Sequence, residues 1–417
     1  MKVLVLGAGA REHALVWKFS LSTRISGLFA APGNAGTQDL ATNLPDVDPL
    51  NAEAVVAACK ENGITHVFIG PEEPLTLGVA DALTEAGIAA IGAHREAAQL
   101  EGSKAFSKAF MARNSIPTAG YAQFTCFDEA SRYIKNRRKK IVLKKSGLAG
   151  GKGVLESDNT AEMLGFAEKV LKDDALVIEE FLEGFEATVF AVCDGKTYIL
   201  LPPCADFKKA GANDTGPNTG GMGSVCPVPW LDAKIQQRIR TETVEPTFAA
   251  LKKENLMYKG ILYFGLMITK DGPKVLEYNV RFGDPETQAL LPLISSDFGN
   301  LCDAVTSGAL ESFPLEVSGK ASLGVVIAAE GYPADYERQI PVQFTGKFDE
   351  KDIHLFHAST LRDGAGTVLT NGGRCFTVVA EGKDIYEAAE RAYAGVKNVG
   401  FKGAWYRPDI GKRFMAE

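Results

Sequence analysis

Short apolar runs alternate with amphipathic helical stretches over roughly the first quarter of the chain, and this alternation limits the fold more than any other feature. The apolar runs cover residues 2–7, 27–34, 65–74 and 88–92, and the helical stretches cover 12–21, 52–63 and 78–87. Strands that alternate with helices predict parallel βαβ units and an open α/β sheet. Ligands bind such sheets at the carboxyl ends of the strands. We therefore expect a site among residues 6–13, 31–37 and 70–74.

The pattern changes at about residue 103 to strands that are joined by hairpins. Asp194-Gly195 and Asp271-Gly272 each separate two apolar runs, which is a strong signal for an antiparallel hairpin. A smaller section after about residue 317 contains two strands and one helix, at 321–331, 373–382 and 385–399. We predict a multidomain α/β and α+β protein. Its parts are an N-terminal open parallel α/β domain (1–102), a central antiparallel domain (103–316) and a small C-terminal α+β domain (317–417).

The composition is that of an ordinary globular protein and excludes several classes. The 417 residues are 46% hydrophobic and 23% charged, and the net charge of −7 gives no electrostatic signature for nucleic acid. The basic run KNRRKK (135–140) is interpreted as a solvated helix end rather than a phosphate patch. No apolar stretch approaches the roughly 18 residues of a membrane span. The seven scattered cysteines indicate reduced thiols in a cytoplasmic protein.

The segment GAGARE (7–12) has the first two glycines of a dinucleotide-binding turn, but Glu12 stands in the place of the third. No acidic residue follows before Asp39, so the carboxylate that would hold a ribose is missing as well. These departures disfavour a nicotinamide cofactor. Two interpretations remain: a tight strand-to-helix turn without a ligand, or a phosphate site on a small substrate, since a helix N-terminus and Arg11 favour an anion.

The segment KKSGLAGGKGV (144–154) is rich in glycine and lysine and directly follows the apolar run 141–143. Backbone N–H groups in such a loop can approach phosphates closely, and a lysine adds a point charge. The usual phosphate loop needs Ser or Thr after its lysine, and here Gly153 follows Lys152. The segment therefore indicates another nucleotide-binding design, or none.

The strand in KVLEYNVRFGDPE (274–286) carries the most informative set of polar residues. Alternation predicts Glu277, Asn279 and Arg281 on one face and Leu276, Tyr278 and Val280 on the other. Magnesium prefers oxygen ligands that it shares with nucleotide phosphates, which fits Glu277 and Asn279. Arg281 is suited to bind a phosphate or carboxylate through two parallel hydrogen bonds. The alternative is a solvent-facing polar stripe on an edge strand. Asp284 and Glu286 add two acids in the following turn.

Three further segments carry weaker signals. VIEEFLEGFE (177–186) could offer backbone groups to an adenine ring and a carboxylate to a ribose, or it could be a hairpin with surface acids. DTGPNTGGMGS (214–224) is a glycine-rich loop, and long loops inside compact domains are mostly functional. Histidine is absent from 95 to 353, which excludes a histidine-based nucleophile or zinc site in the central domain. His354 and His357 are interpreted as core or surface residues rather than metal ligands.

Eight segments in this order resemble the phosphoribosylamine–glycine ligases (glycinamide ribonucleotide synthetases), a family of ATP-grasp enzymes of purine biosynthesis. They are GAGAREHAL, APGNAGT, GPEEPL, LEGSKAF, SGLAGGKGV, EEFLEGFEA, DTGPNTGGMGS and LEYNVRFGDPETQ. The resemblance covers essentially the whole chain. It implies an ATP-grasp fold for the central domain, with a mobile lid at about 120–190 whose loop 146–153 closes over the triphosphate.

The resemblance also implies the site residues. ATP would be bound by Lys144, Gly150, Gly151, Lys152, Gly153, Glu179, Glu180, Leu182 and Glu186. Glu277 and Asn279 would hold Mg²⁺ or Mn²⁺, and Arg281, Lys152 and Asp284 would be catalytic. The substrates would contact Gly9, Arg11, Glu12, Asn34, Glu72, Asp206, Lys208, Asn218, Thr219, Gly220, Gly221, Arg281 and Asp284.

The implied reaction joins glycine to 5-phosphoribosylamine through a glycyl phosphate, with ATP as the phosphoryl donor. No covalent enzyme nucleophile is needed, and a lid would keep water from the acyl phosphate. The resemblance implies small-molecule substrates, no nucleic acid, no membrane, a cytoplasmic location and transient contact with neighbouring purine-pathway enzymes. Four departures from the family are Lys145 and Gly150 around the glycine loop, Phe207 where histidine is usual, and Ser359 where glycine is usual. The strand 261–269 also lacks the acid that many ATP-grasp relatives place there.

Two rival functions use the same fold. An ATP-grasp carboxylase or ligase of another pathway would share the central domain, but APGNAGT, GPEEPL and NTGGMG argue against it. A non-catalytic nucleotide-binding module would have lost its metal ligands or its loop lysine, whereas Glu277, Asn279 and Lys152 are all present.

Overall fold

The N-terminal part of the chain forms the expected parallel sheet. A computed structural model describes residues 1–150, 153–346, 348 and 352–415. Its five parallel strands run in the order β3 (Thr42–Asn43), β2 (Gly27–Pro32), β1 (Lys2–Gly7), β4 (His66–Ile69) and β5 (Ala89–Ile91). The helices of this part are α1 (Ala10–Ser20), α2 (Ala52–Asn62), α3 (Glu72–Leu77) and α4 (Val79–Glu85). Of the run 65–74, only His66–Ile69 form a strand, because α3 begins at Glu72.

The central sheet is antiparallel and confirms both predicted hairpins. Its strand order is β11 (Tyr198–Leu200), β10 (Phe185–Asp194), β16 (Lys259–Thr269) and β17 (Gly272–Asn279). The register between β16 and β17 shifts at Leu276, where a β-bulge interrupts the alternation. Val275, not Leu276, is therefore buried on the same side as Tyr278 and Val280, so the predicted placement of Leu276 is wrong.

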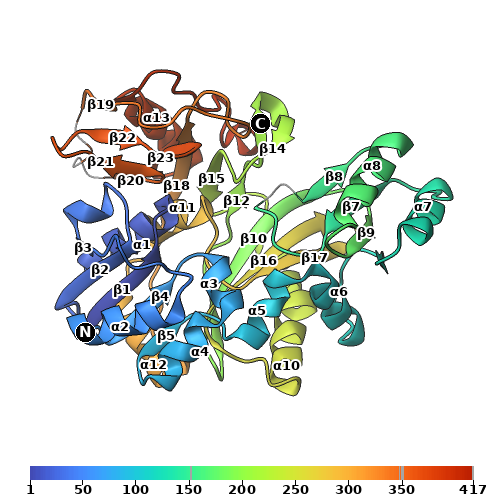
Figure 1. Cartoon of the computed structure of the whole chain (residues 1–417), viewed down its shortest axis with the longest axis horizontal. Coiled ribbons are helices and arrows are strands. Elements are labelled where there is room, and N and C mark those ends of the chain that lie inside the picture. Colours follow the sequence, from blue (N-terminus) through green and yellow to red (C-terminus); the bar gives the residue numbers. More distant parts are fainter. Residues whose placement is uncertain (151–152, 347, 349–351, 416–417) are drawn as a thin grey trace.

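A second antiparallel sheet projects from the body of the molecule (Figure 1). Its order is β6 (Tyr121–Phe124), β9 (Leu176–Glu180), β7 (Ile141–Lys145) and β8 (Val154–Glu156). Helices α7 (Phe127–Lys135) and α8 (Thr160–Val170) cover one face and enclose a separate small core that includes Ile134, Leu143 and Ile178. We call residues 121–180 the lid. Helices α5 (Arg95–Gly102) and α6 (Lys104–Arg113) lead into it.

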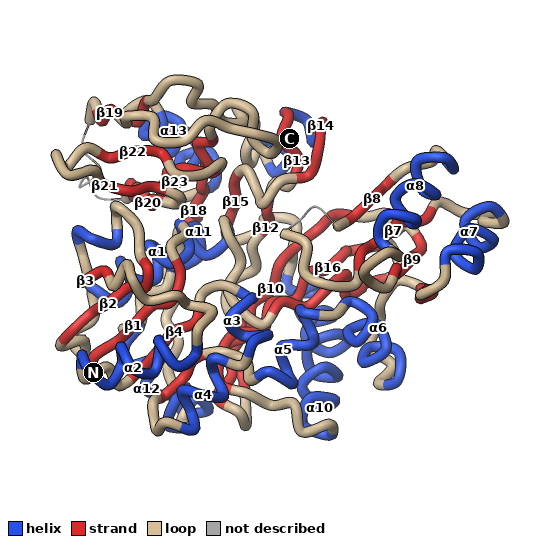
Figure 2. The backbone as a smooth tube through the Cα atoms, in the orientation of Figure 1, coloured by secondary structure: helices blue, strands red, loops and turns tan. Residues whose placement is uncertain are grey.

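The C-terminal sheet includes strands from the middle of the chain. Its order is β12 (Ala205–Asp206), β15 (Gly223–Cys226), β18 (Ala321–Ala328), β23 (Arg374–Gly382) and β20 (Ile353–His357). Figure 2 shows β12 and β15 beside β18. The sheet therefore runs across the predicted boundary at 317, and the domain boundaries stay predictions.

The remaining elements complete these layers. They are α9 (Ala233–Ile239), a π-helical turn (Arg240–Val244), α10 (Glu245–Lys253), α11 (Glu286–Leu293), α12 (Phe298–Ser307) and α13 (Ile385–Val396), and the strand pairs β13 (Lys209–Gly211) with β14 (Thr215–Asn218), β19 (Gln343–Phe344) with β24 (Val399–Gly400), and β21 (Thr360–Arg362) with β22 (Val368–Thr370). No helix in the described ranges is both long and apolar enough to cross a membrane.

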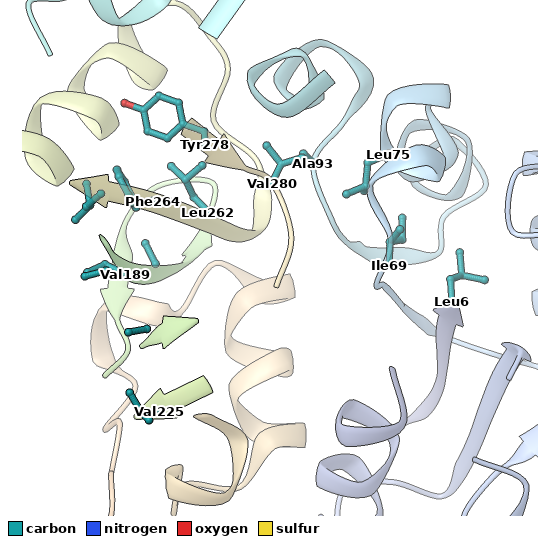
Figure 3. Close-up of a cluster of buried hydrophobic side chains, with 14 of the residues drawn as sticks. Leu6, Ile69, Leu75, Ala93, Val189, Val225, Leu262, Phe264, Tyr278 and Val280 are labelled. Atoms are coloured by element: carbon teal, nitrogen blue, oxygen red, sulfur yellow. The ribbon is translucent and has the colours of Figure 1, made fainter. Parts of the chain in front are cut away.

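One continuous apolar core links the N-terminal sheet to the central sheet. Leu6 and Ile69 at the ends of β1 and β4 belong to the same buried cluster as Tyr278 and Val280 at the end of β17 (Figure 3). Close packing makes such a core stiff. The core therefore fixes the carboxyl ends of β1, β4 and β17 relative to one another, and the polar residues discussed below lie at these ends.

Candidate active site

Arg281 directly follows β17 and is held between two acidic side chains from the N-terminal part of the chain. Its Nε lies 3.3 Å from Glu72 Oε2, and its Nη2 lies 2.6 Å from Glu101 Oε1. Burial alone would lower the pKa of Arg281, but Glu101 and Glu72 hold it above its usual range. The guanidinium is therefore a permanently charged donor with a fixed orientation, suited to a carboxylate or a phosphate.

Glu101, near the end of α5, is a site residue that the sequence analysis does not predict. Its Oε2 accepts a hydrogen bond of 2.8 Å from the Val280 N–H. Burial raises the pKa of Glu101 to about 7, against the opposing effect of Arg281. The sequence feature that could have identified Glu101 is its position on the same face of α5 as the buried Ala97 and Ala98. A fully buried acid is rare unless it is paired.

Glu277 and Asn279 lie on β17 as predicted, and Glu277 is surrounded by cations. Burial alone would raise the pKa of Glu277, but Lys208, Lys144, Lys104 and Arg281 hold it below its usual value. The Asn279 amide oxygen is 3.5 Å from Arg281 Nη2, at the limit of a hydrogen bond, so its lone pairs are available.

The oxygen donors of β17 fit Mg²⁺ or Mn²⁺ that is shared with phosphates. An ionised carboxylate and an available amide oxygen are hard ligands. Among the residues that the structure describes, no group of three His, Cys, Asp or Glu side chains could enclose a metal. The donor set therefore suits a metal that takes its other ligands from a nucleotide rather than a closed structural site.

The inner face of the lid carries a buried lysine–glutamate–lysine group. Lys144 Nζ on β7 lies 3.0 Å from Glu179 Oε1 on β9, and Lys108 Nζ on α6 lies 2.9 Å from Glu179 Oε2. Burial lowers the pKa of Lys108 to about 8. Lys108 also donates to Thr118 Oγ1 at 2.7 Å. Glu179 thus fixes Lys144, the predicted phosphate ligand, and Lys108 is a second residue that the sequence analysis misses.

The glycine loop leaves the lid between β7 and β8. The Gly153 carbonyl accepts a hydrogen bond of 2.8 Å from the Lys145 N–H, so the loop starts and ends at neighbouring positions. Gly150 and Gly153 are described. Gly151 and Lys152 lie outside the described residues, and their roles stay predictions.

The predicted nucleoside-binding residues follow β9. The Glu180 side chain accepts a hydrogen bond of 3.0 Å from the Gly120 N–H, which holds its pKa below the usual value. Within the described part of the chain, the Leu182 N–H donates to no other group. Glu186 on β10 forms an ion pair with Lys208 rather than standing alone.

Asp206 and Lys208 lie close to Glu186. Burial raises the pKa of Asp206 to about 7, although Lys208 opposes the shift. Burial would lower the pKa of Lys208, but Asp206 and Glu186 hold it well above its usual value. Phe207, where the family usually has histidine, is buried with the Arg413 guanidinium 4.3 Å from its ring centroid. The structure therefore gives Phe207 a packing contact in place of a polar one.

The glycine-rich loop 214–224 is held in place by the C-terminal sheet. Arg374 Nη1, on β23, donates to the carbonyls of Gly220 and Gly221 at 2.6 and 3.3 Å and to the Asp284 carbonyl at 3.0 Å. The same nitrogen lies 3.2 Å from Asp284 Oδ1. Arg374 is the third site residue that the sequence analysis does not predict, and it connects two predicted substrate segments.

The loop itself is shaped for close contacts. Thr219 closes it through two hydrogen bonds of 2.8 Å to the Lys208 carbonyl, and Asn218 ends β14 beside it. Gly221 has φ +109° and faces the Pro285 ring, so a side chain there would be strained and would also clash. The chain therefore places Thr219, Gly220 and Gly221 against the Asp284 turn.

A side chain of α1 itself, Glu12, lies at the first glycine turn. The Glu12 carboxylate accepts a hydrogen bond of 2.7 Å from the Gly9 N–H and pairs with Arg11 Nε at 2.6 Å. Arg11 also donates to the Phe282 carbonyl at 2.9 Å. The N-terminus of α1 thus already holds the Glu12 carboxylate, and the phosphate site at this turn stays a prediction. Side chains at Gly9 and Gly70 would meet Glu12.

Asn34 ties its own loop together. Its amide nitrogen donates to the carbonyls of Ala8 and His357 at 2.9 Å, and its oxygen accepts from the Gly36 and Thr37 N–H groups at 2.9 and 3.0 Å. These bonds join the first two βα turns to β20. The contact of Asn34 with substrate stays a prediction.

Asp284 faces Gly9 and Arg11 from the turn after β17. Burial would raise its pKa, but Arg374 and Arg11 hold it below the usual value, with a further hydrogen bond of 2.8 Å from Gln288. The turn therefore joins the N-terminal sheet, loop 214–224 and the C-terminal sheet at one ionised carboxylate.

Two antiparallel sheets, a lid with a fixed lysine and a glycine loop, and a strand with oxygen donors beside an arginine define an ATP-grasp enzyme. Models of the phosphoribosylglycinamide synthetase family match the chain in three parts: the N domain at residues 1–101, the ATP-grasp (A) domain at 102–287 and the C domain at 322–413. The chain belongs to this family. It is an ATP-grasp carbon–nitrogen ligase of purine biosynthesis that uses ATP with Mg²⁺ or Mn²⁺.

Relatives match the chain over its full length. A phosphoribosylamine–glycine ligase of Rhodopirellula baltica is 44% identical, over 99% of this chain and 98% of its own. The trifunctional purine biosynthetic protein adenosine-3 of Gallus gallus is 42% identical over 100% of this chain and 42% of its own. The crystal structure of phosphoribosylamine–glycine ligase from Thermotoga maritima superposes with a TM-score of 0.86 and 34% identity, covering 98% of this chain and 100% of that one.

Similarity extends to a more distant group in fold alone. The biotin carboxylase domain of 2-oxoglutarate carboxylase from Hydrogenobacter thermophilus, in complex with MgADP and bicarbonate, has a TM-score of 0.73 at 20% identity. It covers 97% of this chain and 91% of that one.

Replacing Arg374 by methionine should raise the KM for the phosphorylated substrate about tenfold or more while the protein stays folded. The reason is that three carbonyls and one carboxylate lose a charged donor, and each such bond contributes about 1.5–3 kcal/mol. Steady-state kinetics for each substrate would measure the change. Arg391→Met on α13 is the matched control, since Arg391 bonds only Asp352, Glu381 and Glu387. Equal kinetic effects in both variants would contradict the role of Arg374.

Proposed function

We propose that the protein joins glycine to 5-phospho-D-ribosylamine and forms N1-(5-phospho-D-ribosyl)glycinamide, ADP and phosphate. The observation that carries the proposal is the arrangement around residues 277–284. There Arg281, held between Glu72 and Glu101, acts on the ionised carboxylate of Glu277, and the following turn carries the ionised carboxylate of Asp284 beside Arg374. The sequences of the relatives named above support the same substrates.

ATP binds between the lid and the central sheet in this proposal. Lys144, fixed by Glu179, contacts the phosphates together with loop 146–153 and Lys152. The Glu180 carbonyl and the Leu182 N–H face the adenine, and Glu186 faces the ribose. Release of Glu186 from its ion pair with Lys208 is then part of ATP binding, and Lys208 turns to the substrates.

Glu277 and Asn279 hold the Mg²⁺ or Mn²⁺ that accompanies ATP. When bound, the metal neutralises charge on the phosphate oxygens. Lys104, Lys144 and Lys208 already keep Glu277 ionised, so this strand is ready to accept a cation without a change in protonation.

The first step forms the acyl phosphate. An oxygen of the glycine carboxylate attacks the γ-phosphorus of ATP, the bond from that phosphorus to the bridging oxygen breaks, and ADP leaves. Arg281 orients the attacking carboxylate and stabilises the negative charge on the transferring group. The closed lid keeps water from the glycyl phosphate.

The second step forms the amide. The amine nitrogen of phosphoribosylamine attacks the glycyl carbonyl carbon, the carbon–oxygen bond to phosphate breaks, and the amine loses a proton. Asp284, kept ionised by Arg374 and Arg11, is placed to accept this proton. Gly9, Arg11, Glu12, Asn34 and Glu72 line the side on which this substrate enters, and Asp206, Lys208 and the loop 214–223 lie around Arg281.

The cellular setting belongs to the same proposal. The Gallus gallus relative carries a segment like this chain within a longer trifunctional purine biosynthetic protein. This supports transient contact between the present chain and neighbouring enzymes of purine synthesis in the cytoplasm. We also propose the division into domains at about residues 102 and 317, although one sheet crosses the second boundary.

ADP release with Mg²⁺, ATP and glycine, measured with and without phosphoribosylamine generated from ribose 5-phosphate and ammonia, tests the reaction. We expect ADP release to need both substrates and to match the amount of amide product. Release of ADP with other acids or amines, but not with this pair, would keep the ATP-grasp chemistry and reject the substrates.

A further inference from the structure

The two faces of the lid sheet have different surroundings. Val142 pairs with Glu179, and Ile141 pairs with Glu180, so the register places these pairs on opposite faces. Lys144 shares the face of Val142 and Glu179, which is the inner face assigned to ATP. Ile141 belongs to the small core beneath α7 and α8. The Glu180 side chain therefore lies on the outer face of the lid.

A cleft of about 770 Å³ opens on this outer face. Several of its lining residues come from α7, which lies at the far end of the lid (Figure 1). The apolar lining of the cleft includes Phe124 and Tyr133, whose ring centroids are 5.2 Å apart. Tyr133 is 43% exposed, so part of its ring is open to solvent. The rings form an open wall on which a planar group can stack.

The cleft also has a basic part of its lining, which comes from the KNRRKK run. Arg138 and Lys139 line the cleft and, within the described ranges, make no hydrogen bond or ion pair. Arg137 is fixed by hydrogen bonds to the Ile134 carbonyl, Thr160 Oγ1 and the Asp158 carbonyl. Arg132 at the rim bonds only to the Asp128 carbonyl of its own helix. The run thus supplies two available cations beside a fixed one.

The acids in the cleft do not cancel this charge. Four cations line it, namely Arg132, Arg137, Arg138 and Lys139, against two acids, Glu129 and Glu180. Glu180 already accepts from the Gly120 N–H and lies 3.6 Å from Lys274 Nζ. An anion in the cleft therefore meets a net positive wall, in contrast to the net charge of −7 of the whole chain.

We propose that this cleft is a second nucleotide site, which binds a nucleoside monophosphate on the outer face of the lid, separate from ATP. The base stacks on Tyr133, and the phosphate binds Arg138 and Lys139 through charge-assisted hydrogen bonds. The lid sheet separates the cleft from the inner face, so both sites can be filled at once. Residues 137–139 thus have a role that the interpretation as a solvated helix end does not give them.

Calorimetric titration of AMP into the full-length protein, saturated beforehand with Mg²⁺ and a non-hydrolysable ATP analogue, tests this site. The analogue fills the inner face, so added AMP reports the outer cleft. We expect one further equivalent of AMP to bind. Binding should weaken about tenfold or more, equivalent to about 1.4 kcal/mol, in Arg138→Ala/Lys139→Ala and also in Tyr133→Ala, because each variant removes a stacking or charge-assisted contact.

Lys169→Ala/Lys172→Ala is the matched control, since it removes the same charge from exposed positions of α8 and the turn after it. AMP binding should not change in this control. Absence of a further equivalent, or equal weakening in the control, would overturn the site. If inorganic phosphate bound as tightly as AMP, stacking of the base on the Tyr133 ring would be ruled out. Ligase turnover measured on the same preparations keeps this result separate from the proposed reaction, which needs only the inner face.

Discussion

Replacing Arg281 by lysine should lower kcat by about a thousandfold, the upper end of what loss of one preorganised donor costs. The guanidinium contacts Glu72 through Nε and Glu101 through Nη2, and this leaves its orientation fixed. A lysine ammonium is a single point on a flexible chain, and it cannot contact two carboxylates and a substrate in one plane. Single-turnover measurement of ADP formation would report the loss in the acyl phosphate step.

Loss of stability is the competing explanation for Arg281, and a second variant separates the two. Removing one partner of a buried ion pair costs about 3–5 kcal/mol, so Arg281→Gln alone should lower the midpoint of denaturant unfolding. Arg281→Gln combined with Glu101→Gln removes both charges and should recover most of that stability. Activity should stay lost in the double variant. Recovery of turnover together with stability would show that Arg281 is structural.

The sequence predicts those parts of the fold that rest on local patterns. The hairpins at Asp194-Gly195 and Asp271-Gly272 and the parallel sheet follow from turn residues and periodicity within short windows. The pairing of β15 with β18 does not, because Gly223 and Val325 lie 102 positions apart in the chain. The bulge at Leu276 could not be predicted either, because it arises from the pairing of β17 with β16. The sequence of β17 alone shows only the alternation of polar and apolar residues.

The candidate site divides in the same way. Glu277, Asn279 and Arg281 can be found because they alternate within one short segment, at the end of β17 and just after it. Glu101 and Arg374 act on β17 and its following turn from 179 and 90 residues away, and only the tertiary structure shows these partners.

Glu12 shows that one local pattern can support two interpretations. The glycine turn indicates an anion site, and the Glu12 carboxylate of the same helix accepts the Gly9 N–H at this turn. A glycine at the start of a helix followed three residues later by glutamate is a capping arrangement, and this signal was present in the sequence. The residue types in a motif thus predict a charge preference, and the side chains inside the motif can already satisfy it.

Replacing Glu277 by glutamine should lower kcat by about a thousandfold and raise the Mg²⁺ concentration that turnover needs. The change keeps the size of the side chain and removes the charge that Lys208, Lys144 and Lys104 hold ionised. An amide oxygen is a weaker ligand for a hard cation than a carboxylate, and metal charge on the phosphates supports transfer. Turnover as a function of Mg²⁺ concentration would measure both effects.

The lysines around Glu277 make a second measurement necessary, because the variant also removes the negative charge that balances their positive charges. Binding of Mn²⁺ in the presence of a non-hydrolysable ATP analogue, followed by electron paramagnetic resonance, reports the metal without turnover. We expect weaker Mn²⁺ binding in Glu277→Gln. Asn279→Asp, which keeps an oxygen donor at the neighbouring position, should retain Mn²⁺ binding. Normal Mn²⁺ binding with lost turnover in Glu277→Gln would show that Glu277 orients the lysines and does not bind the metal. Full activity with a normal Mg²⁺ requirement would exclude Glu277 from the site.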